Sequence, residues 1–127
     1  MKVNVLVDSS GWIEYFADTA NAGKYARLIE KASKSTHFTP TIIVYEVFRK
    51  LKKEAGEKKA LGAIAHIIDR TTIVELTERT AIHAAELSLQ HDFSLADSII
   101  LATALEQQAQ IFTGDRHFKK IRDAQII

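Results

Sequence analysis

Residues 3–16 read VNVLVDSSGWIEYF, and this stretch predicts a buried strand followed at once by a helix. Residues 3–7 are few, mostly apolar and rich in β-branched side chains, as is typical of a strand covered on both faces in a parallel sheet. Asp8 ends the strand, and the residues after it predict a short helix with Ser9 or Ser10 as its N-cap. The stretch is therefore a β–α unit.

The same alternation of strand and helix continues along the chain. Further strands are predicted at 36–39, 72–76, 110–113 and 124–127. Helices are predicted at 21–32, 42–54, 57–68, 78–91 and from about 94 to 108, with a short helical turn at 115–121. In the helix at 78–91, the residues Ile82, Ala85, Glu86 and Leu89 stand at helical spacing. Alternating strands and helices favour an α/β fold with a parallel sheet sandwiched between α-helices, and we expect one such domain over residues 1–127.

The composition is that of an ordinary globular protein. The 127 residues are 46% hydrophobic and 26% charged, and the net charge is +1. No overall field therefore points to a nucleic acid or a membrane, although a local patch could still bind one. The absence of cysteine excludes disulfides and thiolate metal sites and favours a reducing compartment. No apolar run is long enough for a signal peptide or a membrane span, so we expect a cytoplasmic protein with no membrane partner.

Several catalytic motifs are missing from the sequence. There is no GxxxxGKS or GxGxxG loop for phosphates and no GxSxG turn for a nucleophilic serine. The five histidines lack HxxxH spacing, and no cysteine could join them on zinc. The acidic residues remain as candidates for chemistry.

Four acidic residues fall where an α/β sheet places its ligands, outside the carboxyl ends of the strands. Asp8 follows the first strand, and Asp115 comes two residues after the strand that ends at Thr113. Asp97 lies in the first turn of an apolar helix, and Glu46 lies early in the helix after the second strand. If the four converge, a divalent cation would relieve their repulsion. Oxygen ligands favour Mg²⁺ or Mn²⁺ over zinc.

Each acid also has a purely structural interpretation. Asp8 could cap the following helix, and Asp97 could form a capping box with Ser94 and interact with the helix dipole. Glu46 could belong to an exposed salt-bridge face with the basic residues that follow it. Asp115 could be a turn residue. Only the joint placement of the four indicates a shared site.

Four segments occur in order along the chain: VLVDSSGWIEYF, TIIVYEVFRKL, FSLADSIILATAL and IFTGDRHFKKI. This ordered set resembles the PIN-domain nucleases, and most of all the single-domain VapC-type toxins of bacterial and archaeal toxin–antitoxin pairs. The resemblance spans nearly the whole chain. It implies a parallel sheet between helices, with an acidic pocket at the carboxyl ends of the strands.

The resemblance also implies roles for individual residues. The positions that match the family's four acids, which would hold one or two Mg²⁺ (or Mn²⁺) ions, are Asp8, Glu46, Asp97 and Asp115. Thr113 matches a hydroxyl residue that would orient Asp8 by a hydrogen bond, and Ser10 could be a second helper. All four acids are present, so nothing marks an inactive copy.

The activity implied by the resemblance is metal-assisted hydrolysis of RNA, which leaves a 5′-phosphate and a 3′-hydroxyl. Cations must meet the RNA phosphates, and the candidates near the matched acids are Arg49, Lys50, Lys53 and Arg116. These basic residues could instead form ordinary solvated helix faces. Two other functions stay open: a non-toxin PIN-domain nuclease in RNA processing, and a non-catalytic PIN-like binding module.

A VapC-type toxin implies two protein partners, namely a cognate antitoxin and a second copy of the chain in a homodimer. In the family the first helices help to form a groove for the antitoxin, so Trp12, Tyr15 and Phe16 are candidates for that groove, with Trp12 at its edge. Packing in the core is the alternative for at least one of these aromatic residues.

Overall fold

The computed structural model describes residues 3–127, so residues 1 and 2 of the predicted domain lie outside the described part. Within it, the helices are α1 (Ser9–Ala17), α2 (Ala22–Glu30), α3 (Thr41–Ala55), α4 (Glu57–Arg70), α5 (Glu78–His91) and α6 (Leu95–Glu106). The strands are β1 (Asn4–Val7), β2 (Phe38–Pro40), β3 (Thr72–Val74), β4 (Ala109–Thr113) and β5 (Ala124–Ile126). A short 3₁₀ helix, η1 (Arg116–Phe118), lies between β4 and β5. The predicted α/β fold is confirmed.

The named strands pair in parallel. β1 pairs with β4, with Val7 opposite Phe112, and β4 pairs in turn with β5. β2 and β3 form a separate parallel pair, and an isolated parallel bridge between Val5 and His37 connects this pair to β1. The strands therefore follow the order β3-β2-β1-β4-β5. β1 lies in the middle, and the residues that follow it lie at the centre of one edge of the sheet.

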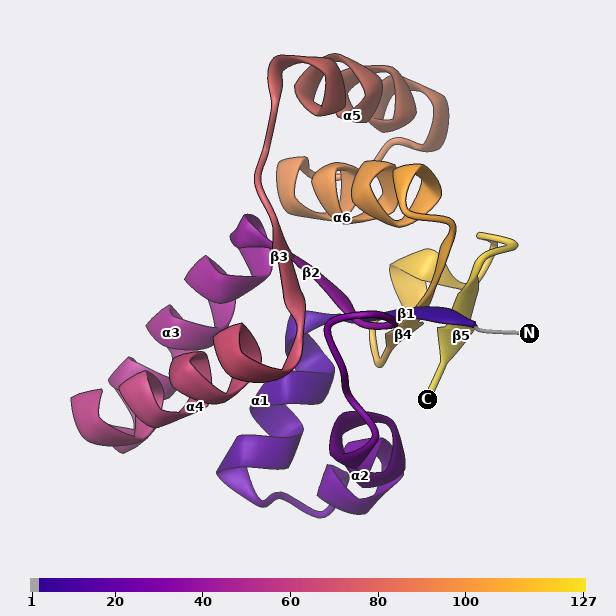
Figure 1. Ribbon diagram of the computed structural model, residues 1–127. Helices are drawn as coiled ribbons and strands as arrows, with labels where there is room; N and C mark the ends of the chain where they lie inside the picture. Colours follow the sequence, from indigo (N-terminus) through magenta and orange to yellow (C-terminus); the bar gives the residue numbers. More distant parts are fainter. Residues whose placement is uncertain (1–2) are drawn as a thin grey trace.

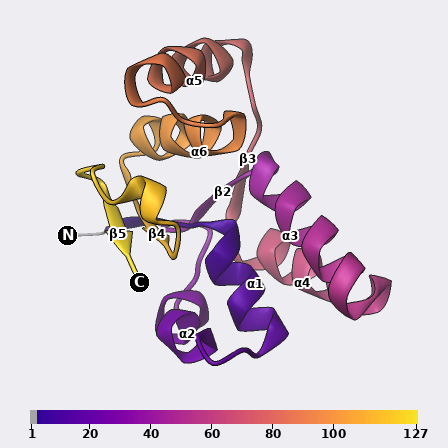
Figure 2. The ribbon, with the colours of Figure 1, turned by 180° about the vertical axis from the view of Figure 1, so that it is seen from behind.

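Helices cover both faces of the strands, as predicted. Figure 1 shows α5 and α6 above the strands and α1 to α4 below them, and the view from behind in Figure 2 shows the same layers. α6 lies between α5 and the strands, and every residue from 98 to 104 is buried. This burial explains why the segment is apolar on all sides rather than on one stripe.

The apolar stripe of α5 does not face the sheet. Its buried residues include Ala84 and Leu87, whereas Ile82 is 64% exposed and Leu89 is 89% exposed. The reason is that α5 packs chiefly on α6 through a different face, which carries the buried residues Thr80, Ala84 and Leu87. The stripe at helical spacing thus remains on the surface, where Leu76, Leu89 and Leu95 line an apolar groove of ≈ 470 Å³.

The N-cap of α1 is Asp8, so the prediction of Ser9 or Ser10 as the cap is wrong. Asp8 has the extended backbone that a cap requires, with φ −65° and ψ 162°, whereas Ser9 and Ser10 are already helical. The strand thus runs into the helix with no intervening loop, and the carboxylate of Asp8 is held at the junction.

No helix in the described range 3–127 is long and apolar enough to cross a membrane.

Candidate metal centre

The four predicted acids line one cleft of ≈ 580 Å³ at the carboxyl ends of β1 and β4. Asp8 comes from the end of β1, and Asp115 comes from the turn after β4. Glu46 projects from α3, and Asp97 projects from the first turn of α6. The parallel strands deliver two of the acids to the same edge, and the two helices that flank this edge supply the others.

Asp8 is the most deeply buried of the four, at 4% exposed. The hydroxyl of Thr113 donates to Asp8 Oδ2 at 2.7 Å, and the backbone N–H of Ser9 donates to Oδ1 at 2.8 Å. Burial raises the pKa of Asp8, these two hydrogen bonds oppose the rise, and the carboxylates of Asp97 and Asp115 add to it. Asp8 is therefore a fixed carboxylate that a nearby positive charge would stabilise.

Asp97 is held by the start of α6. The hydroxyl of Ser94 accepts a hydrogen bond from the backbone N–H of Asp97 at 3.3 Å, so Ser94 caps the helix. Burial raises the pKa of the Asp97 carboxyl, and the charge of Asp115 raises it further, while His117 lowers it. Capping and site formation are thus compatible: the backbone of Asp97 takes part in the cap, and its carboxylate faces the cleft.

Glu46 has a carboxylate oxygen, Oε1, that is buried and has no hydrogen-bond partner in the described residues. Burial raises the pKa of Glu46, and the charge of Asp8 raises it further. The ion pair of Lys50 is with Glu54, at 3.2 Å, rather than with Glu46. An exposed salt-bridge face therefore does not account for Glu46, and a cation in the cleft would.

The turn that carries Asp115 is tied to Asp8 by hydrogen bonds. The backbone N–H of Asp115 donates to Thr113 Oγ1 at 2.9 Å, so the hydroxyl that binds Asp8 also fixes the turn. Ser10 Oγ accepts from the backbone N–H of Gly114 at 3.1 Å. Ser10 thus holds the turn, whereas Thr113 holds both Asp8 and the turn.

His117, to which no motif in the sequence pointed, joins the acids. Its Nδ1 lies 3.1 Å from Asp115 Oδ1 and 3.5 Å from Asp97 Oδ2. The ligand atoms of these three residues all lie within 4.8 Å of one another. The signal in the sequence is the spacing, because a tight turn after Asp115 brings the side chain two positions later back to the Asp115 carboxylate.

These residues fit a divalent cation. Three carboxyl groups have raised pKa values, and one buried carboxylate oxygen lacks a partner. A bound cation would neutralise the carboxylates and supply the missing partner. The donors are mainly carboxylate oxygens, which suit Mg²⁺ or Mn²⁺ rather than a closed structural zinc site.

The four predicted RNA contacts divide into two groups. Arg49 and Lys50, on the exposed side of α3, line the acidic cleft. Lys53 lines a neighbouring apolar depression with Tyr45, and Arg116 is exposed and outside the cleft lining. The structure thus brings two of the four basic side chains to the candidate metal centre.

Trp12 is only 1% exposed, so its prediction as an edge residue of a groove is wrong. The ring stacks on Phe16 with centroids 6.0 Å apart, and Phe16 meets His66 of α4 edge to face at 5.3 Å. Trp12 is buried because α1 lies between α2 and α3. Tyr15 and Phe16 remain partly exposed, and of the three aromatic residues only these two can meet a partner directly.

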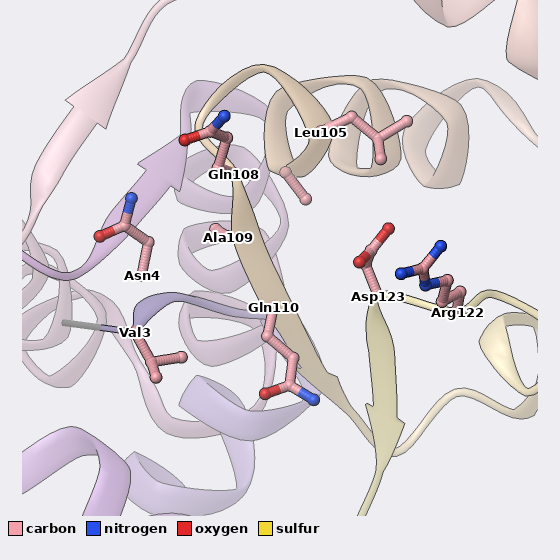
Figure 3. Close-up of a pocket in the computed structure, with 9 residues that line it drawn as sticks. Val3, Asn4, Leu105, Gln108, Ala109, Gln110, Arg122 and Asp123 are labelled. Atoms are coloured by element: carbon pink, nitrogen blue, oxygen red, sulfur yellow. The ribbon is translucent and has the colours of Figure 1, made fainter. Parts of the chain in front are cut away.

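A second cleft, of ≈ 590 Å³, lies at the opposite ends of β1 and β4. Figure 3 shows Asn4, Gln108, Gln110, Arg122 and Asp123 around it. Asp123 is the single carboxylate in this lining, so the second cleft does not present the cluster of acids that a divalent cation requires.

The chain is thus a small parallel α/β domain with a cluster of carboxylates at the carboxyl edge of its sheet. The family model described as the PIN domain matches residues 5–124. The chain therefore belongs to the PIN-domain family.

Solved structures with the same fold include toxins. A toxin–antitoxin complex from Klebsiella pneumoniae is 22% identical, with a TM-score of 0.78 and 96% of both chains covered. A VapC toxin of Mycobacterium tuberculosis that cleaves the sarcin–ricin loop is 21% identical, with a TM-score of 0.77 over 91% of this chain and 93% of that one. DNA-bound VapBC from Salmonella typhimurium is 16% identical, with a TM-score of 0.74 over 98% of this chain and 97% of that one. A search of curated proteins finds no significant match.

Proposed function

We propose that this PIN-domain protein is a divalent-metal-dependent endoribonuclease and the toxin of a toxin–antitoxin pair. The observation that carries the proposal is the gathering of four carboxylates in one cleft, where Glu46 has a buried oxygen without a partner. Structural similarity to a toxin described as cleaving the sarcin–ricin loop supports RNA as the substrate class.

In the proposed reaction, Asp8, Asp97 and Asp115 hold Mg²⁺ or Mn²⁺, and Glu46 is a further ligand or orients the attacking water. When bound, the cation lowers the pKa of a water and offsets the negative charge that develops on the phosphate. Arg49 and Lys50 attract the RNA backbone to the rim of the cleft. Through its two hydrogen bonds, Thr113 fixes the position of Asp8 relative to the turn that carries Asp115.

We also propose two protein partners. Complexes with VapB among the similar structures support an antitoxin, and Tyr15 and Phe16 are the candidate contacts on this chain. A homodimer would cover exposed apolar side chains such as Leu89 and Leu95 on the groove between α5 and α6. Large exposed apolar side chains that gather on one face are typical of a protein interface.

The first prediction tests the nuclease proposal. Purified protein free of antitoxin should cleave RNA in Mg²⁺ and lose this activity in EDTA. Asp97→Asn should lower the rate by roughly a hundredfold or more, because the loss of a carboxylate weakens metal-dependent charge stabilisation by several kcal/mol. Cleavage is measured with labelled RNA. Mg²⁺ should also raise the melting temperature of the parent but not of Asp97→Asn.

The matched control is Asp69→Asn, which neutralises an exposed acid on α4 away from the cleft. This variant should cleave RNA at the parent rate. If Asp97→Asn, folded, cut RNA as fast as the parent, the proposed site would be wrong. A parent protein that binds Mg²⁺ but cuts no RNA would favour the binding-module alternative. Cleavage without growth arrest on expression would favour a processing nuclease over a toxin.

A further inference from the structure

His117 differs from the other side chains of the candidate metal centre because it brings nitrogen to a set of oxygens. Its ring is 76% exposed, yet Nδ1 faces the carboxylates of Asp97 and Asp115. The side chain of an exposed histidine that has no binding partner is free to point into water. The position of Nδ1 between two acids therefore calls for an explanation.

The backbone at His117 is fixed by the same turn that carries Asp115. The N–H of His117 donates to Asp115 Oδ1 at 2.8 Å, and the next residue, Phe118, is completely buried and anchors the turn in the core. Through Thr113 the turn is connected to Asp8. The backbone that carries the imidazole is thus fixed by the fold of the turn.

The separations of the ligand atoms suit a single ion. Two neighbouring ligands on an octahedral ion, with bonds of about 2.1 Å, lie roughly 3 Å apart. His117 Nδ1 lies 3.1 Å from Asp115 Oδ1 and 3.5 Å from Asp97 Oδ2. These two separations are close to those expected for adjacent ligands, and all three ligand atoms lie within 4.8 Å of one another.

We propose that His117 is a nitrogen ligand of the metal, through Nδ1, alongside Asp97 and Asp115, and that it makes the site prefer Mn²⁺ to Mg²⁺. This inference rests on the metal centre of the proposed function. Mg²⁺ takes oxygen ligands and keeps much of its water, whereas imidazole favours first-row transition ions. A nitrogen donor in a carboxylate site therefore adds affinity for Mn²⁺ and little for Mg²⁺.

The test measures metal binding without RNA. Isothermal titration calorimetry with Mn²⁺ and with Mg²⁺ compares the parent with His117→Ala. We expect Mn²⁺ affinity to fall on the order of tenfold and Mg²⁺ affinity to change by less than about twofold. Because His117 is exposed and its backbone hydrogen bond does not need the side chain, the variant should fold as the parent does, which circular dichroism checks.

Bound Mn²⁺ also gives a direct spectroscopic readout. Electron spin echo envelope modulation should show coupling between Mn²⁺ and an imidazole ¹⁴N nucleus in the parent. His117→Ala should remove this coupling. His91→Ala, which alters an exposed histidine at the end of α5 that does not line the cleft, should keep the coupling. Coupling that survives in His117→Ala, or Mn²⁺ and Mg²⁺ affinities that fall equally, would overturn the inference.

Asp97→Asn separates this inference from the proposed function. If Asp97→Asn abolishes Mn²⁺ binding but the parent shows no ¹⁴N coupling, the carboxylate centre stands and His117 is not a ligand. If Asp97→Asn and His117→Ala both leave Mn²⁺ binding unchanged, the metal centre itself lies elsewhere and the proposed function loses its main support.

Discussion

At the scale of single residues, burial disfavours the charged form of an ionisable side chain, whatever the sign of its charge. Asp8 and His37 are both buried and hydrogen-bonded. Burial raises the pKa of Asp8 and lowers the pKa of His37, because in each case it disfavours the charged form. At Asp8 the result is a carboxylate that suits a cation, and at His37 it is a neutral imidazole that joins two parts of the fold.

His37 gives a prediction about stability and pH. Its ring lies within hydrogen-bond distance of Leu28 O at 3.0 Å and of Thr36 Oγ1 at 2.8 Å, and burial lowers its pKa below the ordinary value of 6.5. The stabilising contribution is therefore present above pH 6.5 and is lost as the pH falls through the lowered pKa. We expect the melting temperature to fall between neutral and mildly acidic pH.

A substitution of His37 should change this dependence of the melting temperature on pH. His37→Gln should be less stable than the parent at neutral pH, by about 1–3 kcal/mol for lost buried hydrogen bonds, and its melting temperature should fall less steeply on acidification. His91→Gln, at an exposed position, should keep the parent's slope. If His37→Gln kept the full parent slope, another group would be responsible for the acid sensitivity.

At the scale of elements, close approach between helices depends on small residues. A Cβ atom at Gly11 in α1 would lie 2.7 Å from the ring of Tyr25 in α2 and 2.7 Å from Val7 Cγ1 in β1. Gly11 therefore lets α1 approach Val7 of β1 and Tyr25 of α2 closely. On the other face, Thr80 and His83 of α5 both meet the carboxylate of Glu106 in α6.

Gly11→Ala is predicted to destabilise the protein. The added methyl group has no space between Tyr25 and Val7, and overpacking of this kind costs about 1–3 kcal/mol, which exceeds the helix-propensity gain of roughly 1 kcal/mol. The free energy of unfolding in urea measures the effect. Gly62→Ala in α4 is the control, because nothing lies within 4 Å of its added Cβ, and it should stabilise the protein. A Gly11→Ala variant as stable as the parent would show that α1 can shift without loss.

At the scale of the whole molecule, the two sides of the sheet are covered unequally. α1 to α4 pack among themselves below the strands, whereas α5 above them packs chiefly on α6 (Figure 1). The outer apolar residues of α5 thus have no further layer to cover them within the described chain. This unequal covering is the structural basis for placing the second copy of the proposed homodimer at the α5–α6 groove.

The homodimer gives a prediction about mass in solution. The parent should sediment as a dimer, and Leu89→Glu should sediment as a monomer, because a charge at a buried interface lacks a partner. Leu61→Glu, at an exposed position on α4, should remain dimeric. A parent that is monomeric at all concentrations would contradict the homodimer. Dissociation by Leu61→Glu but not by Leu89→Glu would place the second copy on α4.

Local pattern alone was enough to predict much of this protein. Short apolar strands that alternate with helical segments identified the order of elements, because each signal depends on residues close in sequence. The four acids could be proposed as a set because parallel strands bring their carboxyl ends to one edge. Resemblance to a known family then supplied the chemistry that no single acid implied.

The tertiary structure alone decided which face of each helix is covered and which side chains meet. Helical spacing in α5 is the same whether its apolar stripe faces in or out, so only packing on α6 showed that Ile82 and Leu89 are exposed. The buried ring of Trp12 meets His66 of α4, more than fifty positions along the chain. The approach of His117 to Asp97 joins residues twenty positions apart. Such contacts depend on distances across the fold, and these become defined only when the sheet and its helices assemble.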